Sequence, residues 1–220
     1  MLHEGNGKHP HVFDLLLALF MLSTILLFIG TIRNITVNRN GFDDTSPPIP
    51  LTVSPTEAIG ANPSFLGNPS AQYTLVEFAD YQCAPCKQTN TDISKFLAQH
   101  VGTVRMVFRN LPLTDIHHSA MDAAVTAEVA RQKGRFWEMH DAIYERQQTL
   151  SSQSLRVLSK ERNLNLDMPL TKMARNHVEN DIKYAKHLNI ASVPTFILCC
   201  PNGQVFQLGA LNQASAYLKP

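Results

Sequence analysis

Apolar residues dominate the first part of the chain. From Val12 to Ile32 almost every position is apolar, with Asp14 as the sole charge. About twenty such residues, at roughly 1.5 Å rise each in a helix, cross a hydrocarbon core of about 30 Å. A cleaved signal peptide is the alternative, but its apolar core usually has about 7–15 residues and a small-residue cleavage site follows it. This run is longer and residues 33–37 offer no good site, so we expect residues 1–37 to form an uncleaved, single-pass membrane anchor.

Residues 38–64 break the apolar pattern. Prolines recur in this segment, at positions 47, 48, 50, 55 and 63, among Asn, Ser, Thr, Gly and Asp. Proline removes a backbone donor and favours extended backbone. The segment is therefore predicted to be a semi-rigid linker without helix or strand, and the globular domain is expected to cover residues 65–220.

Beyond residue 65, strand-like and helix-like patterns alternate, which predicts an α/β fold. Short, β-rich apolar runs predict strands at 73–79, 103–109, 196–200 and 204–208, and the last two flank an Asn-Gly turn typical of a hairpin. Amphipathic or alanine-rich stretches predict helices at about 83–99, 120–133, 136–148, 154–161, 167–188 and 212–218.

Composition narrows the class of protein. An apolar share of 44% with 17% charged residues excludes a fully disordered chain. The formal net charge is +1, from 19 Lys+Arg and 18 Asp+Glu, so there is no large positive field for a nucleic acid and we expect no such partner. The four cysteines are too few for a disulfide scaffold.

Two of the cysteines form a C-x-x-C motif at the start of a predicted helix, directly after a predicted buried strand. The helix N-terminus would stabilise a thiolate on Cys83, and Cys86 lies one turn further on, close enough to form a disulfide with it. The alternative is half of a zinc site, which needs two further ligands at finger-like spacing. Cys199 and Cys200 are adjacent instead, so the redox interpretation is favoured.

Helical spacing assigns the two thiols to different environments. Cys86 shares a face with Ile93 and Leu97, so we expect Cys86 in the core and Cys83 at the exposed tip of the helix. Cys199 and Cys200 are interpreted as small apolar strand residues. A second redox pair is the alternative, which the strain of a disulfide between adjacent residues disfavours.

Glu77 and two histidines are the remaining candidates. Glu77 lies inside an apolar strand, six residues before Cys83, and the residues alone leave it as either a solvent-facing side chain or a buried carboxylate. Arg109 is considered as a partner for Glu77. His117 and His118 precede a helix and are interpreted as core or capping residues rather than catalytic ones.

Several stretches of the chain together resemble one family. They are residues 67–70 (GNPS), 75–83 (LVEFADYQC), 104–112 (VRMVFRNLP), 134–141 (GRFWEMHD) and 193–196 (VPTF). Their order resembles the DsbA-like thiol:disulfide oxidoreductases of the thioredoxin superfamily, over residues 65–209. The resemblance implies a thioredoxin fold with a helical insertion at about 113–188 and a cis peptide bond before Pro194. It also implies that Val193, Pro194 and Thr195 shape the substrate groove, and that Glu77 is a buried carboxylate that transfers protons near Cys86.

On this basis we expect a membrane-tethered enzyme that introduces disulfides into exported proteins, with Cys83 as nucleophile and Cys86 as resolving thiol. We expect no metal and no organic cofactor. Its partners would be exported proteins with cysteines and, as the family implies, a membrane redox partner such as a quinone-linked oxidase or an electron carrier. The alternatives are a reductase or isomerase of the same fold that is fed by a membrane electron carrier, and a tethered metal-binding module that uses the C-x-x-C motif as ligands.

The location of the domain follows from chemistry rather than from charge. Positive residues flank the apolar run on both sides, with Lys8 before it and Arg33 and Arg39 after it. The positive-inside rule therefore gives almost no indication of the orientation. A stable disulfide catalyst belongs where thiols are not kept reduced. We therefore expect a cytoplasmic N-terminus and a catalytic domain outside the cytoplasm, in a bacterial periplasm.

Overall fold

The computed structural model describes residues 19–24 and 46–218 of the chain. It divides into two compact units, Met1–Asn40 and Gly41–Pro220, which are described separately. In the first unit, residues 19–24 are helical and exposed. In the described ranges, no helix has the length and apolar character needed to cross a membrane. Most of the predicted anchor lies outside the described residues, so the anchor stays a prediction.

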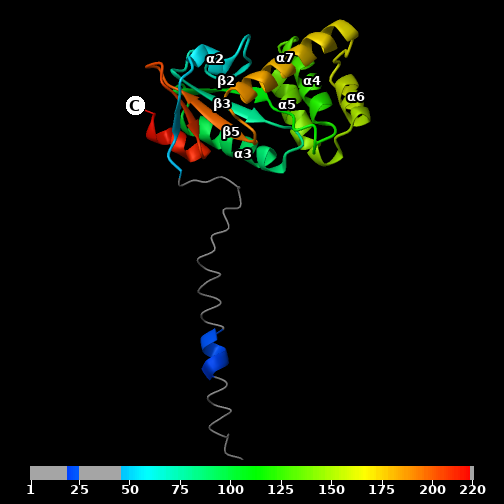
Figure 1. Ribbon diagram of the computed structural model, residues 1–220. Helices are drawn as coiled ribbons and strands as arrows, with labels where there is room; N and C mark the ends of the chain where they lie inside the picture. Colours follow the sequence, from blue (N-terminus) through cyan, green and yellow to red (C-terminus); the bar gives the residue numbers. More distant parts are fainter. Residues whose placement is uncertain (1–18, 25–45, 219–220) are drawn as a thin grey trace, which may run out of the picture. The chain divides into compact units, whose positions relative to one another are not determined.

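The second unit is built on a six-stranded sheet (Figure 1). Its strands are β1 (Ile49–Leu51), β2 (Phe65–Gly67), β3 (Tyr73–Ala79), β4 (Val104–Asn110), β5 (Thr195–Cys199) and β6 (Val205–Leu208). Their order across the sheet is β1-β6-β5-β3-β4-β2. β3 and β4 are parallel, and every other neighbouring pair is antiparallel. The carboxyl ends of β3 and β4 therefore meet at one edge of the sheet, from which the chain leaves towards the C-x-x-C motif.

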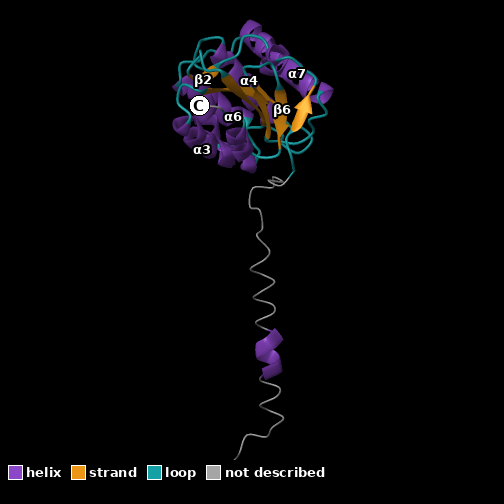
Figure 2. Cartoon of the chain, turned by 90° about the vertical axis from the view of Figure 1, so that its left-hand side faces the viewer, coloured by secondary structure: helices purple, strands orange, loops and turns teal. Residues whose placement is uncertain are grey.

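Helices lie around the strands (Figure 2). They are α2 (Pro55–Ile59), α3 (Ala84–Gln99), α4 (Ala120–Arg131), α5 (Phe136–Glu145), α6 (Ser152–Glu161) and α7 (Met168–His187), with 3-10 turns at Gln147–Thr149 and Leu211–Ala216. Between β4 and β5 the chain forms α4 to α7, which gather on one side of the unit (Figure 1). This is the predicted α/β fold with a helical insertion. The predicted final helix is a shorter 3-10 segment.

Alternation along β3 divides the core in two. Leu75 packs in a cluster with residues of α3, α4 and α5, including Cys86, whereas Val76 and Phe78 pack in a second cluster with Ala58 of α2 and residues from the end of α7. The sheet is thus covered by helices on both faces. Glu77 shares the face of Leu75, because side chains two apart along a strand point the same way.

The linker prediction is wrong for residues 49–59. Ile49–Leu51 pairs with β6, and Pro55–Ile59 is a helix that packs into the second cluster. Proline is compatible with both elements. β1 is an edge strand, where Pro50 need not donate to a neighbour, and Pro55 occupies the first turn of α2. Ser54 and Glu57 form a capping box at that helix start, a signal that the proline content concealed.

Candidate active site

The cysteine pair lies where β3 passes into α3. After β3, the turn of residues 80–82 leads to Cys83, the N-cap residue of α3, and Pro85 stands in the first turn, where its missing N–H is harmless. Both thiols are free, and the backbone N–H of Cys86 lies 3.4 Å from Cys83 Sγ. The helix start thus presents its unpaired N–H groups to the Cys83 sulfur.

The two thiols differ in electrostatics as the helix phase predicts, although Cys83 is less exposed than expected. Cys83 is 6% exposed and Cys86 0%. The hydrogen bond with the Cys86 side chain lowers the pKa of Cys83, burial opposes this, and the Cys86 backbone N–H assists it. Burial, followed by the hydrogen bond with Cys83, raises the pKa of Cys86. Cys83 is therefore the thiol that ionises first.

Glu77 is a buried carboxylate beneath the pair, 1% exposed. Burial raises its pKa to about 8, which a hydrogen bond from Thr89 partly offsets. The Thr89 hydroxyl lies 3.1 Å from Glu77 Oε1 and 2.9 Å from the carbonyl oxygen of Cys86. Glu77 also acts electrostatically on Cys86, raising the pKa of that thiol. A group with a pKa near 8 in this position can both hold and release a proton near neutral pH.

A cis peptide bond joins Val193 to Pro194, as the family resemblance implies. The carbonyl oxygen of Val193 lies 3.7 Å from Cys83 Sγ and can accept the thiol proton. Thr195 opens β5, and its hydroxyl donates to the carbonyl of Ser192 at 2.8 Å, which fixes the loop. This loop covers Cys83 and explains the low exposure of that thiol.

Arg109 is not the partner of Glu77. In the parallel register Glu77 lies opposite Phe108, so the next residue, Arg109, points to the other face of the sheet. There its Nε lies 2.8 Å from Asp181 Oδ1 on α7.

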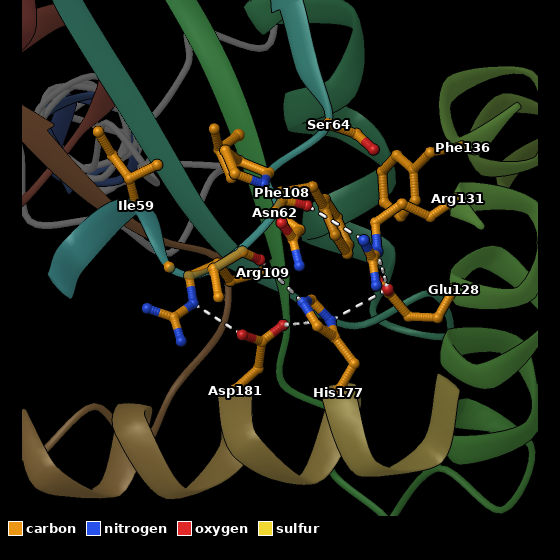
Figure 3. A pocket seen from close by; sticks show the side chains of 14 residues that line it. Ile59, Asn62, Ser64, Phe108, Arg109, Glu128, Arg131, Phe136, His177 and Asp181 are labelled. Atoms are coloured by element: carbon orange, nitrogen blue, oxygen red, sulfur yellow. Dashed lines mark hydrogen bonds and ion pairs between the residues drawn. The ribbon is translucent and has the colours of Figure 1, made fainter. Parts of the chain in front are cut away.

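Arg109 belongs to a charged cluster around a small cavity of about 10 Å³ (Figure 3). His177 connects its two halves, with Nδ1 at 3.0 Å from Glu128 Oε2 and 4.0 Å from Asp181 Oδ2. Arg131 pairs with Glu128 at 2.5 Å. Each carboxylate thus has cationic partners, and the cluster links α4, α7 and β4 rather than forming part of the cysteine site.

Three residues, Asp80, His117 and Gln147, make contacts at the cysteine site that the sequence analysis did not predict. Asp80 accepts hydrogen bonds in the turn before Cys83, and His117 pairs with it at 2.8 Å. Gln147, from the insertion, donates to the carbonyl oxygens of Tyr81 at 2.8 Å and Cys83 at 2.9 Å. His117 and Gln147 are far from the motif in sequence, so their contacts with it could not be predicted. Only Asp80, in the turn just before Cys83, was recognisable from the sequence as a neighbour of the motif.

Cys199 and Cys200 do not face one another. Cys199 packs in the cluster of Val76, whereas Cys200 packs in the cluster of Leu75, so the two thiols lie on opposite faces of the sheet. Burial raises the pKa of both, that of Cys199 to about 12. This fits the interpretation as apolar strand residues. Within residues 19–24 and 46–218, no group of three His, Cys, Asp or Glu side chains is placed to hold a metal ion.

Comparison with known sequences gives two results. A family model described as thioredoxin matches residues 61–219. Two curated relatives are the Na(+)/H(+) antiporters NhaA 3 of Salinispora tropica, 34% identical over 136 residues, and NhaA of Nitrosospira multiformis, 30% identical over 138 residues. Each alignment covers 60% of this chain but only 21% or 22% of the relative. The chain thus spans about a fifth of the length of these curated relatives, and their transport activity is not carried over to it.

Solved structures match over most of the chain. DsbA2 of Pseudomonas aeruginosa is 22% identical, with 72% of this chain and 93% of that chain covered and a TM-score of 0.57. Oxidised BdbD of Bacillus subtilis is 24% identical, with 76% and 95% covered and a TM-score of 0.59. At these identities the likeness shows the fold, and the predicted resemblance to DsbA-like proteins is confirmed at that level.

Proposed function

Since the chain belongs to the thioredoxin family and has the DsbA-like form of its fold, we propose that it is a thiol:disulfide oxidoreductase that introduces disulfides into exported proteins. One observation carries the proposal. Cys83 is an N-cap thiol with a lowered pKa, next to a buried Cys86 with a raised pKa and covered by the loop that holds Pro194. Such asymmetry is what directional thiol–disulfide exchange requires.

The exchange would begin from the Cys83–Cys86 disulfide. A client thiolate attacks Cys83 Sγ, the intramolecular S–S bond breaks, and Cys86 leaves as a thiolate that needs a proton. Glu77, protonated below its pKa of about 8, can supply that proton. A second client thiolate then attacks the client sulfur of the mixed disulfide and releases Cys83 as a thiolate. The client loses two electrons, and the enzyme pair gains them.

The proposed direction of electron flow is supported by the lowered pKa of Cys83. Stabilising the thiolate stabilises the reduced form, and this makes the disulfide a better oxidant. The residues between the cysteines, Ala84 and Pro85, carry no charge. They therefore add no positive charge that would stabilise the Cys83 thiolate. We expect an oxidant weaker than DsbA, with a reduction potential on the order of −150 to −220 mV, between about −120 mV for DsbA and about −270 mV for thioredoxin.

Titration of the full-length protein against a glutathione buffer, followed by thiol trapping, measures this potential. A value near −270 mV or lower would contradict the oxidase function and favour the reductase alternative. Cys83→Ser should abolish exchange, whereas Cys86→Ser should accumulate mixed disulfides through Cys83. Tight zinc binding without any exchange in the unsubstituted protein would instead favour a metal-binding module.

We also propose that the apolar run at 12–32 anchors the protein, with the catalytic unit outside the cytoplasm. The support is the length of that run and the need of the chemistry for a non-reducing compartment. A reporter enzyme that is active only after export, fused after Asn40 at the end of the first unit, should be active. Activity of a cytoplasm-dependent reporter alone at the same position would refute the orientation. Reoxidation would then fall to a membrane-bound oxidant such as a quinone-linked oxidase.

A further inference from the structure

The segment that joins β4 to α4 lies against the turn that precedes Cys83. The backbone N–H of Leu113 donates to Asp80 Oδ2 at 2.7 Å, and His117 Nδ1 lies 2.8 Å from the same oxygen. Two residues further on, the N–H of Ser119 donates to Gln82 Oε1 at 2.6 Å. A loop from a distant part of the sequence is thereby held directly beside the nucleophile.

Asp80 is the centre of these contacts. Its side chain is fully buried, its Oδ1 accepts from the N–H of Gln82 at 2.7 Å, and its backbone carbonyl accepts from the N–H of Cys83 at 3.1 Å. A buried carboxylate needs compensation, and one this close to Cys83 disfavours a second negative charge on the thiol. His117 provides a counter-charge when protonated, and its side chain is 23% exposed and thus accessible to solvent protons.

We propose that His117 is a positioning residue that offsets the charge of Asp80 beside Cys83 and so keeps the Cys83–Cys86 disulfide oxidising. The inference rests on the proposed function. Ala84 and Pro85 between the cysteines carry no charge that could stabilise the Cys83 thiolate. The inference assigns this effect to His117 in the β4–α4 segment.

The groups that face Cys83 agree with this role. In the part of the chain that the structure describes, Asp80 raises the pKa of Cys83 and His117 lowers it, after the larger effects of the Cys86 hydrogen bonds and of burial. Glu77 from β3 and Tyr144 from α5 also interact electrostatically with Cys83, and both are neutral when protonated. Protonated His117 is the cation among these groups.

The test is the thiol–disulfide equilibrium of the full-length protein with glutathione, at several pH values. His117→Asn retains a donor for Asp80 but removes the charge. It should weaken the oxidising equilibrium about fivefold, which lowers the reduction potential by about 20 mV at about 30 mV per tenfold. His117→Lys keeps a cation at this position and should restore the equilibrium.

Two further variants separate charge from structure. Asp80→Asn should shift the equilibrium in the opposite direction, towards a stronger oxidant, whereas a merely structural pair would give the same direction for both variants. His118→Asn is the matched control, since His118 is exposed and adjacent, and it should leave the equilibrium unchanged. If Asp80→Asn fails to fold, the contrast between His117→Asn and His117→Lys still shows whether a positive charge at position 117 is what matters.

The outcomes distinguish this inference from the proposed function. A potential at or below about −270 mV for the unsubstituted protein would refute the oxidase function, whatever His117 does. An oxidising potential that His117→Asn leaves unchanged at every pH would refute the role of His117 alone. Equal shifts for His117→Asn and His117→Lys would likewise overturn it, because only one of them lacks a cation.

Discussion

Glu77→Gln should make the protein more stable at neutral pH. The pKa of Glu77 is about 8 in the folded protein against an ordinary value of 4.5, because burial disfavours the ionised form. At pH 7 the folded protein therefore holds a proton that the unfolded chain has released. Where the folded state binds more protons, stability falls as pH rises, by about 1.4 kcal/mol per pH unit for one proton.

The magnitude follows from the interval between the ordinary pKa of 4.5, which applies in the unfolded chain, and pH 7. From pH 4.5 to pH 7 the loss amounts to about 3 kcal/mol. Glutamine has nearly the same shape as a protonated glutamate and can keep a hydrogen bond with Thr89, yet it never ionises. The variant should therefore match the unsubstituted protein near pH 4 and exceed its free energy of unfolding by about 3 kcal/mol at pH 7.

Urea denaturation of the full-length protein with reduced thiols, run in parallel at pH 4.5 and pH 7.5, measures the effect. Glu145→Gln is a suitable control, because Glu145 is exposed at the end of α5 and its replacement should change little at either pH. The same stability difference between Glu77→Gln and the unsubstituted protein at both pH values would show that Glu77 is not a buried, protonated carboxyl. In exchange assays, the variant should release Cys86 more slowly because its proton donor is gone.

Two further predictions concern the hydrogen bond between Thr89 and Glu77 and the pair formed by Glu128 and His177. Thr89→Val removes the hydrogen bond that lowers the pKa of Glu77, so that pKa should rise further, as carbon-13 NMR titration of the carboxyl would show. Glu128 raises the pKa of His177, so their interaction stabilises the fold at low pH and is lost as pH rises through that raised value. His177→Gln should accordingly cost about 1 kcal/mol in urea unfolding at pH 5 and less at pH 8.5; an equal cost at both would contradict this.

Sequence patterns predicted the elements whose signals are local. The apolar run at 73–79 is β3 to the residue, and the helices of the insertion lie within a few residues of their predicted bounds. The C-x-x-C geometry was also accessible, because a helix start and its phase fix where Cys83 and Cys86 point. Local signals were misleading at residues 49–59, where the proline content outweighed the capping box of Ser54 and Glu57, and at Cys83, which is 6% exposed although its position at the helix start predicted an exposed thiol.

Contacts between distant residues could not be predicted in the same way. Nothing in the sequence indicates that His117 reaches Asp80, which lies 37 residues earlier, or that Arg109 meets Asp181 on α7. Both pairs depend on how the insertion packs on the sheet. The burial of Glu77 is an intermediate case, because alternation gives its face but only the position of α3 shows that this face is covered.

The two edges of the sheet bear on how the protein would meet unfolded chains under the proposed function. Both edge strands, Ile49–Leu51 and Phe65–Gly67, have three residues. Pro50 lies within the first, and Pro69 follows the second closely. Long, regular edges attract extended segments of other chains, and short edges interrupted by proline offer them little backbone to pair with. Under the proposed function, a catalyst that meets aggregation-prone clients would thus offer them little sheet edge to pair with.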